Sequence, residues 1–357
     1  MNRKNICEIC TLIMGQSPDS KSYNKDKNGI PFYQGNADFG EKHPTPTVWC
    51  TAPKKIARKG DILISVRAPI GDMNIANEDC CIGRGLAAIR LNKSDIVDIN
   101  YLYHYLSATV EFLQEQGTGS TFKAINKTTL EGIEIPCPSI EKQKNIAKLI
   151  IEIKTSIQYK KAELFALNEL VKSRFIEMFG DIRISSIFPN IALENFAQIG
   201  SSKRVHAADY VESGVPFYRS KEIIELGNGQ EPSVELFISK KQYESIKKTN
   251  GVPCKGDILM SAVGTIGKMW IVDGRKDFYY KDGNIISIHS EETNPIYLKE
   301  ALANLIDDFK SANVAGSAYS ALTIVKLKKM TVPMPPMSIQ NEFADFVKLI
   351  DKSKFVG

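Results

Sequence analysis

The feature that most constrains the fold of this 357-residue chain is an internal repeat with a period of about half its length. The run Gly29–Tyr33 (Gly-Ile-Pro-Phe-Tyr) returns as Gly214–Tyr218, with Val in place of Ile. The run Lys59–Ser65 (Lys-Gly-Asp-Ile-Leu-Ile-Ser) returns as Lys255–Ser261, with a single Ile-to-Met change. Repeats of this length indicate two copies of one domain rather than a solenoid of short units.

Four further matches keep the same order along the chain. They pair Ile70-Gly71 with Ile266-Gly267, Tyr101-Leu102 with Tyr297-Leu298, Gly119–Phe122 with Gly316–Tyr319, and Ile135–Pro138 with Val332–Pro335. The offset is 185 at the first match of the chain and 196–197 afterwards. The second copy is therefore predicted to contain an insertion between Lys221 and Asn250.

Each copy has the pattern of a mixed α/β domain. Lys-Gly-Asp before a short apolar run indicates a turn that leads into a buried strand. Apolar residues at helical spacing predict helices over residues 99–116 and 295–310, and Pro295 suits a first helical turn. The proline segments at 136–138 and 333–336 predict extended chain that no helix crosses.

A long heptad helix is predicted between the copies, because residues 139–179 contain no Gly or Pro and Gly180 follows. Such a helix is about 60 Å long and would act as a spacer. Its a/d seam is Ile146, Ile150, Ile153, Ile157, Lys160, Leu164, Leu167, Val171, Arg174 and Met178.

A shorter counterpart with the same spacing follows the second copy, at Phe343, Val347 and Ile350. We expect it to lie antiparallel against the half of the long helix nearest the second domain. The other half would then expose the isoleucines of its seam, and exposed apolar patches usually mark an interface. The sequence therefore predicts a protein–protein interface at Ile146, Ile150, Ile153 and Ile157.

Composition restricts the class of protein further. The chain has 46 basic and 41 acidic side chains, a net charge of +5, which permits a nucleic-acid partner without requiring one. No apolar run is long enough to span a membrane, and the N-terminus lacks the pattern of a signal peptide. Seven scattered cysteines favour reduced thiols and a cytoplasmic location.

Enzyme signatures are missing from the sequence. It contains no phosphate-binding loop, no His-Glu-x-x-His and no nucleophile elbow, and its four histidines are isolated. Cys7 and Cys10 form a lone Cys-x-x-Cys, whereas zinc sites normally need a second pair. We interpret this pair as part of a half-buried strand.

Two similar domains on a rigid spacer present two similar surfaces. DNA is a ligand that matches this arrangement, since half-sites one or more helical turns apart lie on one face of the duplex. Each domain would read one short sequence, and the helix would set the gap between them.

These motifs, in their order and double occurrence, resemble those of the DNA-specificity subunit of type I restriction–modification systems. The stretch Ile135–Ala147 (Ile-Pro-x-Pro-x-x-Glu-x-Gln-x-x-Ile-Ala) before a long helix is similarly typical. The resemblance covers essentially the whole chain. It implies an α+β fold with two tandem target recognition domains, joined by helices that form an antiparallel coiled coil with pseudo-two-fold symmetry.

The resemblance also implies a division of the chain and a set of partners. The expected parts are a first recognition domain (1–138), a central helix (139–180), a second recognition domain (181–337) and a short helix (338–357). The chain would have no catalysis and no cofactor of its own. Methyltransferase subunits would bind S-adenosylmethionine, restriction subunits would cleave DNA, and a second copy of the chain is an alternative occupant of the exposed seam.

Candidate DNA contacts are polar and basic residues beside the repeated motifs, although each could equally be a solvated loop residue. Arg, Gln and Asn can pair bidentately with guanine or adenine edges. The candidates are Gln34, Asn36, Arg67, Arg84, Lys123, Lys203, Arg204, Arg219, Ser220, Lys221 and Lys268. A stand-alone DNA-binding regulator with no enzymatic partner remains the competing interpretation.

Overall fold

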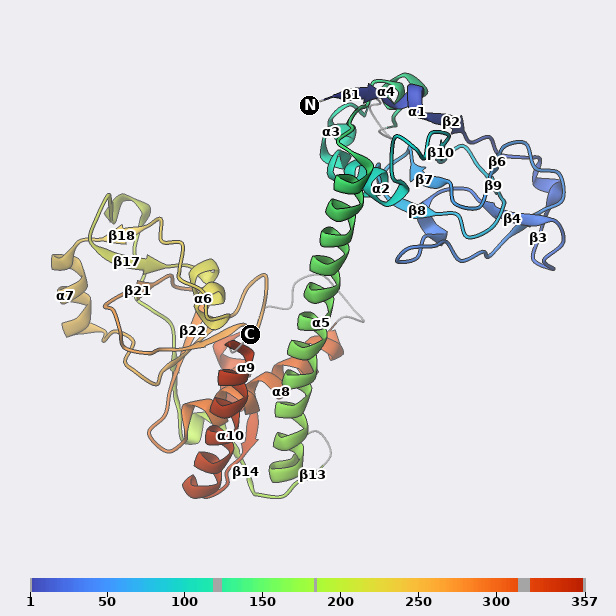
Figure 1. The fold of residues 1–357 in the computed structure, drawn as a ribbon. Coiled ribbons are helices and arrows are strands. Elements are labelled where there is room, and N and C mark those ends of the chain that lie inside the picture. Colours follow the sequence, from blue (N-terminus) through green and yellow to red (C-terminus); the bar gives the residue numbers. More distant parts are fainter. Residues whose placement is uncertain (1, 118–123, 183–184, 314–321, 356–357) are drawn as a thin grey trace. The chain divides into compact units, whose positions relative to one another are not determined.

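The computed structural model describes residues 2–117, 124–182, 185–313 and 322–355 (Figure 1). The chain forms two compact units, Met1–Lys160 and Lys161–Gly357, and the boundary between them falls inside the long helix. The repeated loops Gly119–Phe122 and Gly316–Tyr319 lie outside the described residues, as does Lys123.

The described residues of the first unit form three sheets. A two-stranded sheet pairs β1 with β11, a four-stranded antiparallel sheet has the order β2-β10-β7-β8, and a five-stranded sheet has the order β3-β5-β4-β9-β6 with β4 and β9 parallel. The strands are β1 (Arg3–Asn5), β2 (Cys10–Met14), β3 (Tyr23–Asn24), β4 (Ile30–Tyr33), β5 (Trp49–Cys50), β6 (Ile56–Ala57), β7 (Ile62–Ser65), β8 (Met73–Ile75), β9 (Cys80–Ile82), β10 (Leu86–Leu91) and β11 (Glu134–Pro136).

The second unit repeats this topology. β14 pairs with β23, a four-stranded sheet has the order β15-β22-β19-β20, and another has the order β16-β18-β17-β21 with β17 and β21 parallel. The strands are β12 (Gly180–Asp181), β13 (Ser185–Ser186), β14 (Asn190–Ala192), β15 (Gln198–Gly200), β16 (Tyr210–Val211), β17 (Val215–Tyr218), β18 (Phe237–Ile238), β19 (Ile258–Ser261), β20 (Met269–Ile271), β21 (Tyr279–Tyr280), β22 (Ile285–His289) and β23 (Thr331–Pro333). The mixed α/β fold expected for each copy is confirmed.

The main hydrophobic core of each unit lies where helices pack against the sheet β2-β10-β7-β8 or the sheet β15-β22-β19-β20. The first unit contains α1 (Ile6–Ile9), α2 (Ile99–Ala108), α3 (Val110–Glu115) and α4 (Lys127–Glu131), and the second contains α6 (Ser220–Gly227), α7 (Lys240–Thr249), α8 (Pro295–Asn313), α9 (Ile324–Lys329) and α10 (Met337–Phe355). The long helix α5 (Ile140–Phe179) runs from one unit into the other and ends, as expected, before Gly180.

Two sequence-based expectations of secondary structure are wrong in detail. The helix expected over residues 99–116 is divided at Thr109 into α2 and α3, and its N-terminus is capped by the carboxylate of Asp98. Cys7 is not in a strand but lies exposed on α1, a turn of helix that a reciprocal capping box between Asn5 and Glu8 stabilises.

The repeated motifs occupy equivalent structural positions. Ser65 and Ser261 each donate a hydrogen bond to a carbonyl four residues on, at Pro69 and Thr265. Gly71 and Gly267 then turn with φ of 98° and 79°, and a Cβ there would collide with Val110 or Ile306 on the next helix. Serine therefore shapes a tight turn, and glycine lets that turn approach the helix.

The carboxylate of the Lys-Gly-Asp motif is also structural in both units. Asp61 accepts a hydrogen bond from the Arg58 amide and a two-pronged ion pair from Arg90, with its shorter arm at 2.7 Å. In the second unit His289 takes the place of Arg90, and its Nδ1 lies 2.7 Å from Asp257. Each aspartate therefore joins the turn before a central strand (β7 or β19) to the neighbouring strand (β10 or β22).

A buried glutamine fixes the first turn of the helix that follows each domain. The amide of Gln143 donates to the Pro138 and Ile96 carbonyls, both at 2.8 Å, and accepts from the Asp98 amide at 2.9 Å. Gln340 makes the equivalent bonds, donating to Pro335 at 2.9 Å and accepting from Asn294 at 2.8 Å. Both side chains are inaccessible to solvent, at 0% and 1% exposed.

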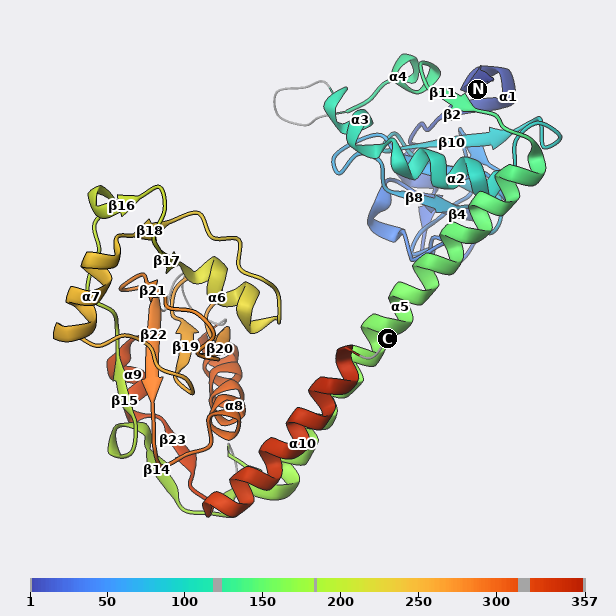
Figure 2. The same cartoon turned by 60° about the vertical axis from the view of Figure 1, so that its left-hand side comes forward.

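Inside the second unit α10 packs along the end of α5 (Figure 2). Phe343 lies edge-on to Phe175 and Phe179, with ring centroids 5.5 and 5.4 Å apart. The seam residue Arg174 bonds Glu342 at 3.1 Å and stacks over Phe346. Arg174, one of the two polar residues of the heptad seam, thus forms an ion pair between the helices.

The part of the α5 seam that the sequence predicts to be exposed is only partly exposed. Ile146 is half-buried, because it packs against the core of the first unit, and its part in an interface stays a prediction. Ile150 is half-buried, whereas Ile153 and Ile157 are 51% and 49% exposed. The same stretch exposes further apolar side chains outside the predicted seam, namely Leu149, Ile151, Tyr159 and Phe165.

Replacing Gln143 with alanine should destabilise the first unit by about 2–4 kcal/mol, because three backbone groups lose their buried partner and a cavity forms. Peptide-resolved hydrogen exchange on the full chain should show the loss of protection within residues 1–160. Gln158→Ala, at an exposed position of the same helix, is the matched control and should leave protection unchanged. Equal exchange in the two variants would contradict this role for Gln143.

Candidate nucleic-acid interface

In the first unit the structure brings together Gln34 and Arg84. Gln34 follows β4, and its Oε1 accepts a hydrogen bond from Ser17 at 2.9 Å. The Arg84 amide donates to the same serine, and the Gly85 amide donates to the Gln34 carbonyl at 3.1 Å. The side chains of Gln34 and Arg84 are exposed on this loop cluster. The sequence does not single out Ser17, because nothing marks it until the loops are placed side by side.

Asn36 and Arg67 belong to the same edge of the unit. Asn36 donates to the Asp72 carboxylate at 2.6 Å, and Asp72 closes the turn that contains Arg67. The amide of Val66, the residue before Arg67, donates a hydrogen bond to the Gly85 carbonyl at 2.9 Å. We call this set, Ser17, Gln34, Asn36, Arg67 and Arg84, the first-unit edge. It offers amide, hydroxyl and guanidinium groups on loops that follow rigid strands.

The second-unit candidates fall into three separate places. Lys268 lies exposed in the turn after β19, against α8. Arg219, Ser220 and Lys221 form the start of α6. Lys203 and Arg204 follow β15 on another loop. Lys203 donates its amide to the Tyr279 hydroxyl at 2.7 Å, and a 2.8 Å hydrogen bond to Asp282 raises the pKa of Arg204.

Arg219 is held by two carboxylates of its own unit. Its guanidinium bonds Glu222 and Glu235, each at 2.8 Å. The hydrogen bonds that Arg219 donates, the one to Glu222 first and then the one to Glu235, raise its pKa, so the group stays charged. Glu222 is only 1% exposed, whereas Lys221 reaches the same Glu235 from the surface. Arg219 therefore compensates a buried charge and positions the segment that joins α6 to β18.

A groove of about 490 Å³ lies beside Lys203. Its walls are the loop after β15 and the segment Asn250–Cys254 that follows α7. The hydroxyl-bearing Tyr279, Tyr280 and Ser287 line it together with His289. This groove is polar and open, and it suits a strand of phosphates and sugars better than an apolar ligand.

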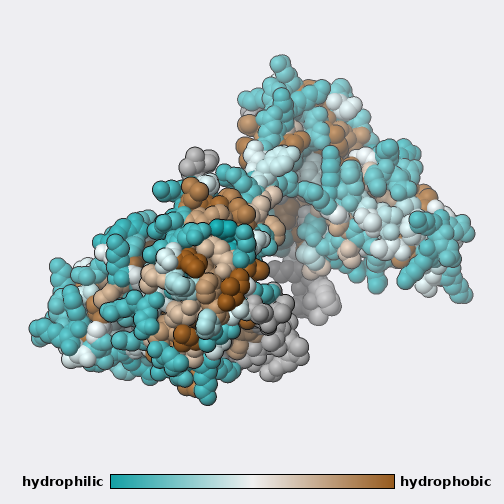
Figure 3. All heavy atoms as spheres, turned by 90° about the horizontal axis from the view of Figure 1, so that it is seen from below, coloured by the Kyte–Doolittle hydropathy of each residue, from teal (hydrophilic) through white to brown (hydrophobic). Residues whose placement is uncertain are grey.

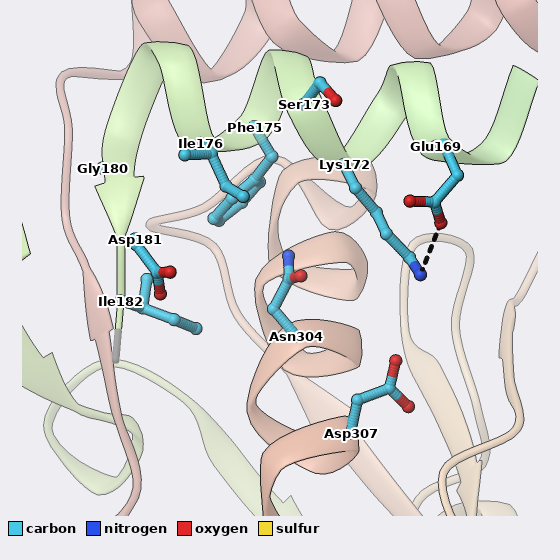
Figure 4. A pocket seen from close by; sticks show the side chains of 10 residues that line it. All are labelled: Glu169, Lys172, Ser173, Phe175, Ile176, Gly180, Asp181, Ile182, Asn304 and Asp307. Atoms are coloured by element: carbon cyan, nitrogen blue, oxygen red, sulfur yellow. Dashed lines mark hydrogen bonds and ion pairs between the residues drawn. The ribbon is translucent and has the colours of Figure 1, made fainter. Parts of the chain in front are cut away.

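A second pocket, of about 300 Å³, lies between the end of α5, β12 and α8 (Figure 4). Phe175 and Ile176 form its apolar wall, and Asn304 and Asp307 point into it from α8. Lys172 is paired with Glu169 at 3.0 Å. None of the predicted DNA contacts lines this pocket.

The described residues contain neither a metal-binding cluster nor a membrane-spanning helix. No group of three or more His, Cys, Asp or Glu side chains in them could hold a metal ion. The helices they form include none with the length and hydropathy of a membrane span. All seven cysteines are free thiols.

Comparison with known proteins gives consistent matches. The family model described as "Type I restriction modification DNA specificity domain" matches residues 1–169 and again residues 188–355. A putative type I restriction enzyme MjaX specificity subunit from Methanocaldococcus jannaschii is 45% identical over 177 residues, which are 49% of this chain and 41% of that protein. A putative specificity subunit from Haemophilus influenzae is 27% identical over 271 residues, 73% of this chain and 66% of that protein. The chain thus spans less than two thirds of either relative.

A solved structure shares the fold. The crystal structure of the S subunit of a type I restriction–modification system from M. genitalium aligns with 99% of this chain and 90% of its own, with a TM-score of 0.60. Only 16% of the aligned residues are identical, so the likeness concerns the arrangement of elements.

Replacing Arg219 with alanine should destabilise the second unit by about 1–3 kcal/mol, because the buried Glu222 is left without its cation. Urea unfolding of the full chain measures the change. Arg275→Ala is the matched control, since Arg275 pairs with Asp273 on the exposed surface and should contribute less than about 1 kcal/mol. Identical unfolding of the two variants would refute the structural role of Arg219.

Proposed function

Because the chain belongs to the family of type I restriction–modification DNA specificity domains, as its sequence predicted, we propose that it recognises a two-part DNA sequence, with one half-site for each unit. One observation carries the proposal: the two units share a framework of strands and buried hydrogen bonds, yet differ in the segments that follow β4 and β17. A common framework with different exposed loops is what two different half-sites require.

The exposed groups have the chemistry of base recognition. An Arg pairs bidentately with the O6 and N7 of guanine, and Gln or Asn pairs with adenine, each for about 1–3 kcal/mol of discrimination. The first-unit edge offers Gln34, Asn36, Arg67 and Arg84. Because strands support these loops, their side chains are more precisely placed than those of a free loop.

Catalysis belongs to partners in this proposal. The relatives are named specificity subunits, non-catalytic components that recognise DNA for a larger complex. Methyltransferase subunits that bind S-adenosylmethionine, and restriction subunits, would supply the chemistry. We place the docking of the methyltransferase on the exposed stretch of α5 around Ile153 and Ile157. The free cysteines suit a reducing cytoplasm.

Co-expression with a methyltransferase of the same system should methylate a gapped, two-part motif, which methylation sequencing would reveal. Arg84→Ala should relax the half of the motif read by the first unit, by about 1–3 kcal/mol at one base pair, and leave the other half intact. Arg58→Ala, at another exposed arginine of the same unit, is the control. An unchanged motif with Arg84→Ala would remove Arg84 from the interface. Tight, specific binding without any partner would favour a stand-alone regulator.

Charged substitutions on α5 should identify the docking surface for the methyltransferase. Ile153→Asp with Ile157→Asp should weaken assembly with the methyltransferase by about tenfold or more, since two half-exposed apolar side chains lose their burial. Size-exclusion chromatography with the co-expressed subunit measures this. Val325→Asp, at a 65% exposed valine on α9, is the control. Loss of self-association with unchanged methyltransferase binding would instead assign the surface to a second copy of the chain.

A further inference from the structure

The helix α7 belongs to the insertion that distinguishes the second unit from the first. In the first unit no α-helix lies among the described residues between β4 and β7. Ser239 caps α7, and its buried residues Tyr243 and Ile246 pack on the sheet formed by β16, β18, β17 and β21. The Tyr243 hydroxyl donates to Asp277 at 3.0 Å. α7 lies on one side of β17 and β21, and α6 lies on the other (Figures 1 and 2). The helix is therefore a fixed element of the unit.

The outer side of α7 is a lysine surface. Lys240, Lys241, Lys247 and Lys248 are all exposed, and Glu244 is the only acidic residue of the helix. With 3.6 residues per turn the four lysines fall within an arc of about 120°. In Figure 3 the left-hand margin, where α7 lies in Figure 1, is hydrophilic.

This charge has no counterpart in the unit itself. None of the four lysines forms an ion pair with the described residues. Residues 181–337 hold 19 basic and 18 acidic side chains, and without α7 they would hold 15 and 17. Four of these 19 basic side chains thus lie on one face of this helix, and such a cluster is the electrostatic pattern of a surface for a polyanion.

The lysine surface continues into the polar groove beside Lys203. The C-terminal end of α7 leads into Asn250–Cys254, which form one wall, and Lys203 stands among the residues that line it. The Tyr279 hydroxyl, which accepts from the Lys203 amide, adds one donor to the groove. Lys240 and Lys247, like Lys241 and Lys248, are seven residues apart, about 10 Å along the axis. That spacing corresponds to roughly three base-pair steps of duplex DNA.

We propose that the lysine surface of α7, with Lys203, binds the sugar–phosphate backbone of duplex DNA and anchors the second unit without reading sequence. This proposal rests on the proposed function and adds to it the element that provides non-specific affinity. A membrane is a poorer match, because a surface-bound amphipathic helix inserts its apolar face, and Tyr243 and Ile246 are already buried in the unit.

The test is DNA binding by the chain assembled with its methyltransferase, measured by fluorescence anisotropy between about 50 and 300 mM salt. The variant replaces Lys240, Lys241, Lys247 and Lys248 with Gln, and the probes are duplexes with and without the methylated motif. Affinity should fall about tenfold or more on both probes. The slope of log K against log salt should decrease by about 2–4, since each phosphate that is no longer neutralised lowers it by about 0.9. The methylated motif should stay the same.

Two matched variants separate the alternatives. Replacing Lys326, Lys328, Lys329 and Lys352 with Gln changes the net charge equally on α9 and α10 and should preserve most of the salt slope. Replacing the four α7 lysines with Arg should also preserve the salt slope, because the positive charge is kept. An unchanged slope in the α7 variant, an equal loss in the α9/α10 variant, or a loss confined to the motif-containing duplex would each overturn the proposal. Failure of the unmodified complex to methylate a two-part motif would instead refute the proposed function.

Discussion

The arrangement of each unit depends on one buried side-chain amide. Gln143 and Gln340 each join three parts of the chain: the proline segment after the last strand, the first turn of α2 or α8, and the helix that leaves the unit. A buried amide must satisfy both its oxygen and its nitrogen, and leaving one unpaired costs about 1–3 kcal/mol. The direction in which α5 or α10 continues from the proline segment is therefore fixed by hydrogen-bond geometry rather than by packing alone.

The repeated residues share a structural task, which separates them from the residues that would recognise a target. Tyr101 and Tyr297 bond the carbonyls of Pro136 and Pro333, and the serine and glycine of each central turn shape its close approach to the next helix. None of these groups is available to a ligand. Function is accordingly placed in segments that differ between the units, such as the first-unit edge and the insertion that contains α6 and α7.

Patterns that repeat or that extend over many residues could be predicted from the sequence. The repeat predicted two domains of one fold, and the absence of Gly and Pro predicted α5. Choices between helix and strand that depend on a few residues could not be predicted in the same way. The capping box at Asn5 makes the Cys7 segment helical, and Thr109 divides the helix that was expected over residues 99–116. The burial of Ile146 depends on how the start of α5 meets its own domain, which heptad spacing does not encode.

The candidate contacts were harder to predict, because charge in a sequence does not reveal its partners. Arg219 looks like a base-reading residue until Glu222 and Glu235 are placed beside it. The sequence of α7 is also typical of a solvated helix, and only the structure shows that its four lysines are exposed on one face. Protein–DNA interfaces divide their work in the same manner, since phosphate contacts fix register and base contacts carry specificity. A second unit with four lysines on one face of a rigid helix can hold the duplex, while its separate loops are left to select the sequence.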